Sequence, residues 1–194
     1  SIFNNLINDK VLSHDDLAHL EYLHIPTEEH PENGYKQILP EEVTDYSIKA
    51  NRKNEFDRVV SHYIQPHQPY YSSSKEYESL SDLEKHPISY LKNGHYDQVW
   101  EAYLDNLRYV LDSVKILLEN IHGSVIITSD HGEMMGELGL YAHPAGHIHP
   151  KLRKVPWIRT QAENKRNRNP DVHLTGIEKT TEIPEAQLEA LGYR

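Results

Sequence analysis

Two consecutive stretches, residues 96–120, "YDQVWEAYLDNLRYVLDSVKILLEN", and 124–129, "SVIITS", decide the fold class of this chain. In the first stretch, apolar residues recur at three- and four-residue steps, the spacing that gathers side chains on one face of a helix. His122-Gly123 ends this helix. The second stretch is a short, continuously apolar run, typical of a strand buried on both faces. The sequence therefore predicts a long amphipathic helix followed by a buried strand.

A second strand is predicted upstream, over residues 58–65, "RVVSHYIQ", a β-branched and aromatic run closed by Pro66. A strand, a long helix and another strand favour an α/β fold with a mixed, mostly parallel sheet flanked by helices. In such sheets, ligands bind beyond the carboxyl ends of the strands. The loops that follow the two strands carry His67 and the pair Asp130-His131. We therefore expect these side chains on one rim of the sheet.

The chain divides into three predicted parts. Residues 1–57 are rich in charge, His and Pro, and we expect mostly irregular structure with one short helix near 15–23. Residues 58–160 form the α/β core, in which one helical turn is expected before Pro87. Residues 161–194 are predicted to be a polar tail that ends in a short amphipathic helix, "IPEAQLEALGY".

Composition excludes several classes of protein. The net charge of -10, with 30 acidic against 20 basic residues, disfavours nucleic-acid binding, and the one basic cluster, "NKRNRN" at 164–169, is interpreted as a solvated loop. No stretch approaches the roughly 20 apolar residues of a membrane span, so we expect a soluble chain without a membrane partner. The absence of Cys excludes disulfides, thiolate ligands and a Cys nucleophile, and it permits the cytoplasmic location that we favour for the chain as given.

Asp130 and His131 are candidate metal ligands, because Gly132 lets the chain turn so that both side chains reach one ion. Two ligands hold an ion weakly, so others must come from elsewhere. Glu133 is expected either to orient His131 or to face solvent. The loop "YAHPAGHIHP" adds His143, His147 and His149. The alternative is structural: these histidines, with His62 and His67, are ordinary polar loop residues.

The order and spacing of these motifs carry a resemblance to a known family. "HYIQPHQPY", the long helix, "VIITSDHGEMMGELGLY" and a His-rich loop closed by "LRKVPWI" resemble the carboxyl-terminal half of sulfatases, which belong to the alkaline phosphatase superfamily. The resemblance covers residues 56–160, and the final "LEALGY" is similar to the end of many such chains. It implies an alkaline-phosphatase-like fold, here incomplete, and hydrolysis of sulfate or phosphate esters.

The resemblance also implies roles for single residues. Asp130 and His131 match the family's late pair of metal ligands; the resemblance implies Ca²⁺ first, with Mn²⁺ or Zn²⁺ as alternatives. His67 matches a His that contacts the sulfate or phosphate group or its leaving group. His143, or less closely His147, matches a residue that binds the ester oxygens. We therefore expect His67, His143 and His147 to be catalytic residues and the partner molecule to be a sulfate or phosphate ester.

One departure from the family limits this expectation. The family's nucleophile, Thr, Ser or a Cys in Cys-x-Pro-x-Arg, and its first Asp ligands lie near the amino terminus. This sequence has no Cys and no Ser-x-Pro-x-Arg, and "SHDDL" at 13–17 is better interpreted as the first turn of a helix. We expect the carboxyl-terminal part of a sulfatase-like hydrolase that does not turn over substrate alone, completed by a missing amino-terminal half or another subunit. The alternative is a non-catalytic metal- or anion-binding module of the same fold.

Overall fold

A computed structural model describes residues 18, 19, 21, 23, 38–71, 77–144 and 146–175. The helix expected near 15–23 falls largely outside these residues, as do "SHDDL" and nearly all of the terminal tail. None of the helices in the described ranges is long and apolar enough to cross a membrane.

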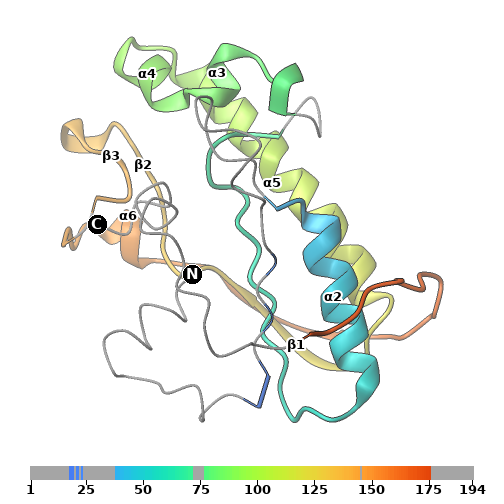
Figure 1. Cartoon of the computed structure of the whole chain (residues 1–194). Helices are drawn as coiled ribbons and strands as arrows, with labels where there is room; N and C mark the ends of the chain where they lie inside the picture. The colour runs from blue at the N-terminus through green and yellow to red at the C-terminus, as the bar shows by residue number, and fades with distance from the viewer. Residues whose placement is uncertain are drawn as a thin grey trace.

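Two helices packed side by side form the main body (Figure 1). The predicted long helix is confirmed as α5, Tyr96–Leu118, and its buried stripe runs through Val99, Asn106, Val110 and Leu117. Its partner is α2, Pro40–Lys53, in a region where we expected mostly irregular structure, so that expectation is wrong. Pro at the first position, acidic residues in the first turn and basic residues in the last turn favour this helix. This helix has too few apolar residues for hydrophobic periodicity to predict it.

The sheets differ from the expected mixed, mostly parallel sheet. Within the described residues, β1, Gly123–Thr128, pairs antiparallel with β4, Trp157–Ala162, and β2, Met134–Met135, pairs antiparallel with β3, Tyr141–Ala142. Residues 58–65, where we predicted a strand, form neither a helix nor a strand and lead into the turn at 65–66. A strand is defined by its hydrogen-bonded neighbour, and a β-branched run predicts only the tendency to extend, not the partner.

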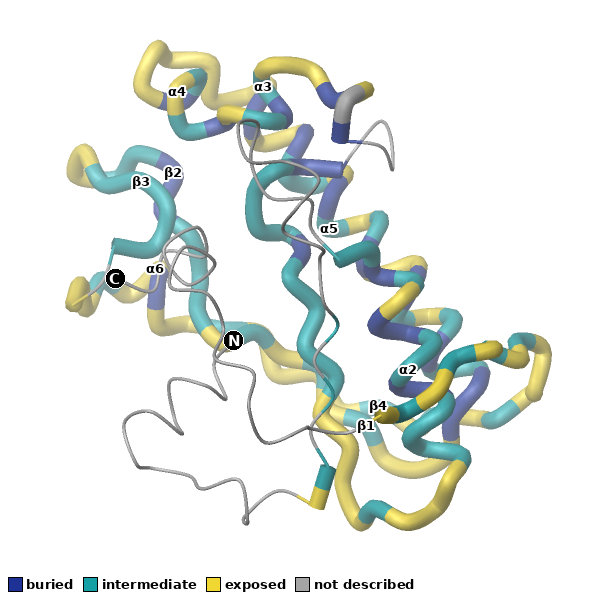
Figure 2. Tube along the Cα trace, in the orientation of Figure 1, coloured by how far each residue is buried: buried dark blue, intermediate teal, exposed yellow. Residues whose placement is uncertain are grey.

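The strand β1 is present as predicted, but it is not buried on both faces. Val125 packs on the cluster of Ile48, Leu117 and Ile121 between α2 and α5, whereas Ile126 on the opposite face is 49% exposed. Figure 2 shows the exposed residues along β1 and β4. The prediction was wrong because a continuously apolar run does not reveal which of its faces another element covers.

A second cluster lies at the amino-terminal end of α5. Val99 and Ala102 of α5 pack there with Tyr70, Leu91 and Met135. The predicted helical turn before Pro87 is α3, Asp82–Lys85, and α4, Pro87–Lys92, follows it directly. Single turns of 3-10 helix occur at Tyr77–Ser79 and Glu137–Gly139, and α6, Pro150–Arg153, precedes β4. Through Met135 of β2, the cluster around Val99 and Ala102 fixes the β2–β3 hairpin against the helices.

The basic cluster 164–169 is not a free solvated loop. Arg168 binds both carboxylate oxygens of Asp45, with Nη2 2.8 Å from Oδ2. Arg52, at the end of α2, donates to Asn120 O and Oδ1, to Asn164 Oδ1, to Arg168 O and to Asn169 Oδ1. The guanidinium of Arg52 therefore joins the carboxyl ends of α2 and α5 to the segment after β4.

Replacing Arg52 by Ala is expected to lower the free energy of unfolding by about 2–3 kcal/mol, because hydrogen bonds to a charged group are lost and the fully buried Asn120 loses a donor. Urea denaturation followed by circular dichroism measures the change. Lys53→Ala is the matched control, because Lys53 is exposed in the same helical turn. Equal midpoints for the two variants would contradict this account of Arg52.

Tyr63 makes the stability of the packed helices α2 and α5 sensitive to high pH. Burial raises the pKa of Tyr63 to about 12, while its hydroxyl lies 2.8 Å from Thr44 Oγ1. Since the pKa is higher in the folded state than the ordinary value near 10, the contribution is fully present below about pH 10 and is lost between about pH 10 and 12. We expect Tyr63→Phe to flatten this part of the stability profile, measured by urea denaturation at successive pH values. Parallel profiles for the two proteins would refute the assignment.

Candidate metal centre

The loop after β1 is fixed by close contact with α6. Gly132 N–H donates to Leu152 O at 2.9 Å, and a Cβ on Gly132 would lie only 1.9 Å from Lys151 O. Only glycine allows this approach of the two backbones. Residues on either side of Gly132 are thereby held beside the β2–β3 hairpin.

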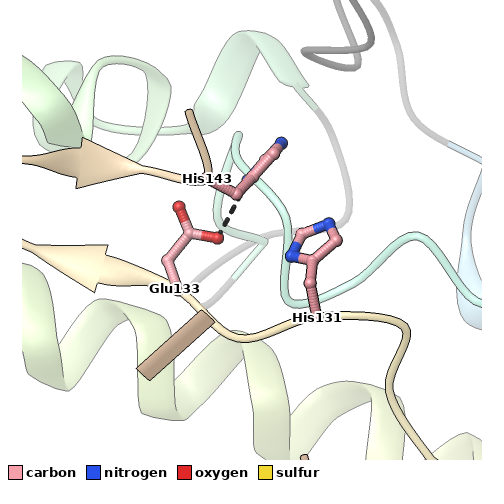
Figure 3. A group of neighbouring side chains, drawn as sticks. All are labelled: His131, Glu133 and His143. Atoms are coloured by element: carbon pink, nitrogen blue, oxygen red, sulfur yellow. Dashed lines mark hydrogen bonds and ion pairs between the residues drawn. The ribbon is translucent and has the colours of Figure 1, made fainter. Parts of the chain in front are cut away.

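Three side chains converge there: His131, Glu133 and His143 (Figure 3). One ligand atom from each lies within 4.8 Å of those of the other two. The His131 and His143 rings are 4.3 Å apart between centroids, and His143 Nδ1 is 3.1 Å from Glu133 Oε2. We call these residues the triad. All three are partly buried.

Hydrogen bonds to the backbone orient two of the histidines. His131 Nδ1 is 2.9 Å from Gly132 O, and His67 Nδ1 is 2.5 Å from Gln68 O. A carbonyl only accepts, so in each neutral ring the proton sits on Nδ1 and the lone pair on Nε2. This anchoring of one ring nitrogen is the arrangement that prepares the other to bind a metal or a proton.

His67 lies next to the triad, with its ring centroid 5.4 Å from that of His143. Burial lowers the pKa of His67, and His143 and His131 add to this effect, whereas the bond to Gln68 O and the carboxylate of Glu133 oppose it. Fully buried Asn106 of α5 donates to His67 O at 3.3 Å and accepts from Tyr71 N at 3.3 Å, so it fixes the loop. His67, Glu133 and His143 share a hollow of about 230 Å³ with Tyr70 and Met135.

Asp130 stands beside the triad but not within it. Its Oδ1 accepts from His131 N at 2.9 Å, and its Oδ2 is 3.8 Å from His131 Nε2. The sequence predicted these two side chains as ligands of one ion, and a separation of 3.8 Å is compatible with that prediction. His62 lies close to the same carboxylate: burial lowers the pKa of His62, and Asp130 opposes this shift. His131 can thus belong to either of two ligand sets, one with Asp130 and one with the triad.

The remaining histidines of the loop lie elsewhere. His147 is exposed, and its backbone N–H bonds to Pro144 O at 3.4 Å. His149 Nδ1 accepts from Lys151 N at 3.2 Å, so this ring caps α6. The structure therefore brings together His67, His131 and His143, with Asp130 adjacent, and leaves His147 outside the group.

Sequence reasoning missed the role of Glu133. We expected it to orient His131 or to face solvent, whereas its described partner is His143 and the backbone orients His131. A signal was present in the spacing: residues two apart in extended backbone point to the same side, as His131 and Glu133 do. Asn106 gave no signal, because one Asn on a helical face does not reveal which loop lies against it.

The donor atoms of the triad fit a divalent transition metal. Ligands at about 2.0–2.2 Å from a tetrahedral ion lie roughly 3.4 Å apart, whereas these atoms lie within 4.8 Å of one another, so a contraction of at most about 1.4 Å closes the set. Two imidazoles and one carboxylate form the set found in catalytic zinc sites that keep a position open for substrate. Ca²⁺ prefers six to eight oxygen ligands, which this group does not supply.

The chain matches a family model described as Sulfatase over residues 5–169. The matched range contains α2, α5, both sheets and every member of the triad. No curated protein and no solved structure shows significant similarity to the chain.

Proposed function

The chain belongs to the sulfatase family, and from this premise we propose that it supplies a metal centre and anion-binding histidines for the hydrolysis of a sulfate ester. The family has an alkaline-phosphatase-like α/β fold and acts on sulfate esters. The observation that carries the proposal is the convergence of His131, Glu133 and His143, of which Glu133 and His143 line one hollow together with His67. Isolated loop histidines would not be expected to share such a space.

His131, Glu133 and His143 would hold the metal, with Asp130 as the alternative partner of His131. A bound divalent metal would supply a positive charge against the ester oxygens. The nitrogen donors favour Zn²⁺ or Mn²⁺ over the Ca²⁺ that the resemblance put first. The anchored Nδ1 of His131 keeps the other ring nitrogen turned away from the backbone of Gly132.

His67 would carry the proton of the reaction. Its Nδ1 is held by Gln68 O, so a proton is gained or lost at Nε2. Because burial lowers the pKa of His67, the protonated ring is a stronger acid than an exposed imidazole. This suits donation to the oxygen of the departing alcohol. His143 lies between His67 and His131, and its Nδ1 is directed at Glu133, so Nδ1 would serve the metal and Nε2 would contact the ester oxygens.

A side-chain nucleophile would have to come from outside the hollow. Among the described residues that line it there is no Ser, Thr or Cys. We therefore propose that the isolated chain binds the metal and the anion but does not turn over an ester. The alternative function is a non-catalytic metal- and anion-binding module, and the lack of Ser, Thr and Cys among the described residues of the hollow supports it.

Binding assays test whether the chain holds the metal and the anion, and turnover assays test whether it hydrolyses an ester. The Zn²⁺-loaded chain is expected to bind inorganic sulfate, measured by calorimetry, and to hydrolyse an aryl sulfate or aryl phosphate no faster than Zn²⁺ with buffer. His67→Ala should weaken sulfate binding by about tenfold, the effect of losing one charge-assisted hydrogen bond. His122→Ala, an exposed His at the opposite end of β1, is the control. Robust turnover would overturn the statement about the nucleophile, and failure to bind metal or sulfate would overturn the proposed function.

A further inference from the structure

A polar side chain lies in the buried stripe of α5, next to the loop that carries His67. Most of the buried residues of this helix are apolar, and Asn106 stands among them with a relative exposure of 0%. Asn has a lower helix propensity than Ala or Leu, and burial of an amide is costly unless hydrogen bonds satisfy it. The helix itself therefore gives no reason for Asn at this position, and the reason lies in what the side chain contacts.

Asn106 bridges the two ends of the segment 67–71. Its Nδ2 donates to His67 O and its Oδ1 accepts from Tyr71 N, each at 3.3 Å. A carbonyl and the N–H that follows it four residues later are the groups that one turn of α-helix joins directly. Here the amide of Asn106 takes the place of that direct bond. The spacing of the two backbone groups, and with it the shape of the segment, therefore depends on this side chain.

The shape of this segment decides how the His67 ring is held. The ring Nδ1 is 2.5 Å from Gln68 O, so the bond depends on the backbone between the two residues. Asn106 binds the carbonyl oxygen of His67, which belongs to the peptide unit that joins His67 to Gln68. A peptide unit is planar and rigid, so holding its oxygen fixes the orientation of the whole unit. Asn106 thus restrains the carbonyl that anchors the ring.

We propose that Asn106 is a positioning residue for the anion site: by holding the peptide unit of His67, it keeps Nδ1 bound to Gln68 O and leaves Nε2 to the ligand. The part of this statement that concerns the ligand rests on the proposed function. Within the described residues, the side chain of Asn106 bonds to His67 and Tyr71 and not to the triad. The affinity for the metal should therefore not depend on Asn106.

The ordinary role of a buried Asn is to satisfy backbone groups, and such a role would act on stability alone. Ser113 provides the matched control, because it is the other polar residue of the same buried stripe and is 2% exposed. The bond that joins Ser113 to Thr44 uses the backbone oxygen of Ser113, so Ser113→Ala preserves it. A positioning role requires Asn106→Leu to change the state of His67, whereas Ser113→Ala leaves it unchanged.

Nitrogen-15 NMR of the imidazole rings tests the positioning without any ligand. The signals of His67 are those that disappear in His67→Ala protein. In the wild-type chain we expect a neutral His67 ring with its proton on Nδ1, and in Asn106→Leu a mixture of both tautomers. Asn106→Gln, which keeps the donor and the acceptor, should retain more of the Nδ1–H form than Asn106→Leu does. An unchanged tautomer in Asn106→Leu would overturn the proposal.

Thermal unfolding shows whether Asn106→Leu is folded. If it is not, Asn106→Ser takes its place in each measurement, because the shorter side chain does not span both partners but adds no bulk to the stripe. The same expectations apply to it, and a wild-type His67 tautomer in folded Asn106→Ser protein would equally overturn the proposal.

Binding of inorganic sulfate to the Zn²⁺-loaded chain, measured by calorimetry, tests the consequence for the anion. Asn106→Leu is expected to weaken sulfate binding about fivefold to tenfold, close to the effect of His67→Ala. Because Asn106 acts through His67, the double variant should bind sulfate no more weakly than His67→Ala alone. Ser113→Ala should bind sulfate as the wild type does. Additive losses in the double variant, or a parallel loss of Zn²⁺ affinity in Asn106→Leu, would assign Asn106 a purely structural role.

The two measurements distinguish failure of this inference from failure of the proposed function. If the wild-type chain binds neither Zn²⁺ nor sulfate, the proposed function fails, and the tautomer of His67 still decides whether Asn106 positions the ring. If the chain binds both and Asn106→Leu binds sulfate as tightly as the wild type, the role of Asn106 is refuted and the proposed function stands.

Discussion

Replacing His131 by Ala is expected to lower the affinity of the chain for Zn²⁺ by more than about 100-fold, since losing a group that only orients a ligand already costs about 10–100-fold. His131 belongs to both ligand sets: its Nε2 is 3.8 Å from Asp130 Oδ2, and it is also a member of the triad. Among the described residues, His131 is the member that the two sets have in common. The loss should therefore occur whichever set binds the ion.

Competition between the chain and a zinc-chelating dye measures this affinity. The control is His122→Ala, which removes an exposed imidazole beyond the other end of β1 and should leave the affinity unchanged. Thermal unfolding of both variants without metal shows whether His131→Ala perturbs the fold. Retention of wild-type affinity in a folded His131→Ala protein would remove the metal centre from the proposed function.

Three companion variants tell the two ligand sets apart. If the triad binds the ion, Glu133→Ala and His143→Ala should each lower Zn²⁺ affinity far more than Asp130→Ala does. If the pair predicted from the sequence binds it, the order is reversed. A comparison of Zn²⁺ with Ca²⁺ adds a second criterion, because a set with two imidazoles binds Zn²⁺ in preference to Ca²⁺.

The sequence predicted those features that depend on neighbours in the chain. The α5 helix follows from apolar residues at helical spacing, and the loop after β1 follows from an apolar run that ends in Asp-His-Gly. The family assignment also came from the order of motifs and is confirmed by the match over residues 5–169. These signals come from residues that are close in the sequence, so they predict structure without knowledge of the tertiary fold.

Features that depend on the partner of an element were not predictable in this way. Nothing in residues 58–65 specifies whether a strand lies beside them, and nothing in "SVIITS" shows that one of its faces is open. The pairing of Glu133 with His143 requires the β2–β3 hairpin to bring position 143 back to position 133. Such two-residue strands are too short to leave a periodic pattern.

Replacing Gly132 by Ala should have the second large effect, on stability and on metal binding together. The added Cβ would lie 1.9 Å from Lys151 O and 3.0 Å from the carbon of the same carbonyl, and both atoms are backbone, so no flexible side chain can move aside. Either the loop 131–133 or α6 must shift, which breaks the bond from Gly132 N to Leu152 O. We expect a loss of about 3 kcal/mol or more in the free energy of unfolding, at the upper end of overpacking effects.

Gly146→Ala is the matched control for this substitution. Gly146 has open space around its Cβ position but a φ of 79°, so alanine there meets a conformational cost without a clash. Urea denaturation should therefore show a cost of about 1 kcal/mol for Gly146→Ala and a several-fold larger one for Gly132→Ala. Zinc affinity should fall in Gly132→Ala alone, because the shift moves His131 and Glu133 relative to His143, whereas position 146 lies outside the triad. Equal stability losses in the two variants, or full zinc affinity in Gly132→Ala, would mean that the contact between the loop and α6 does not hold the metal ligands in place.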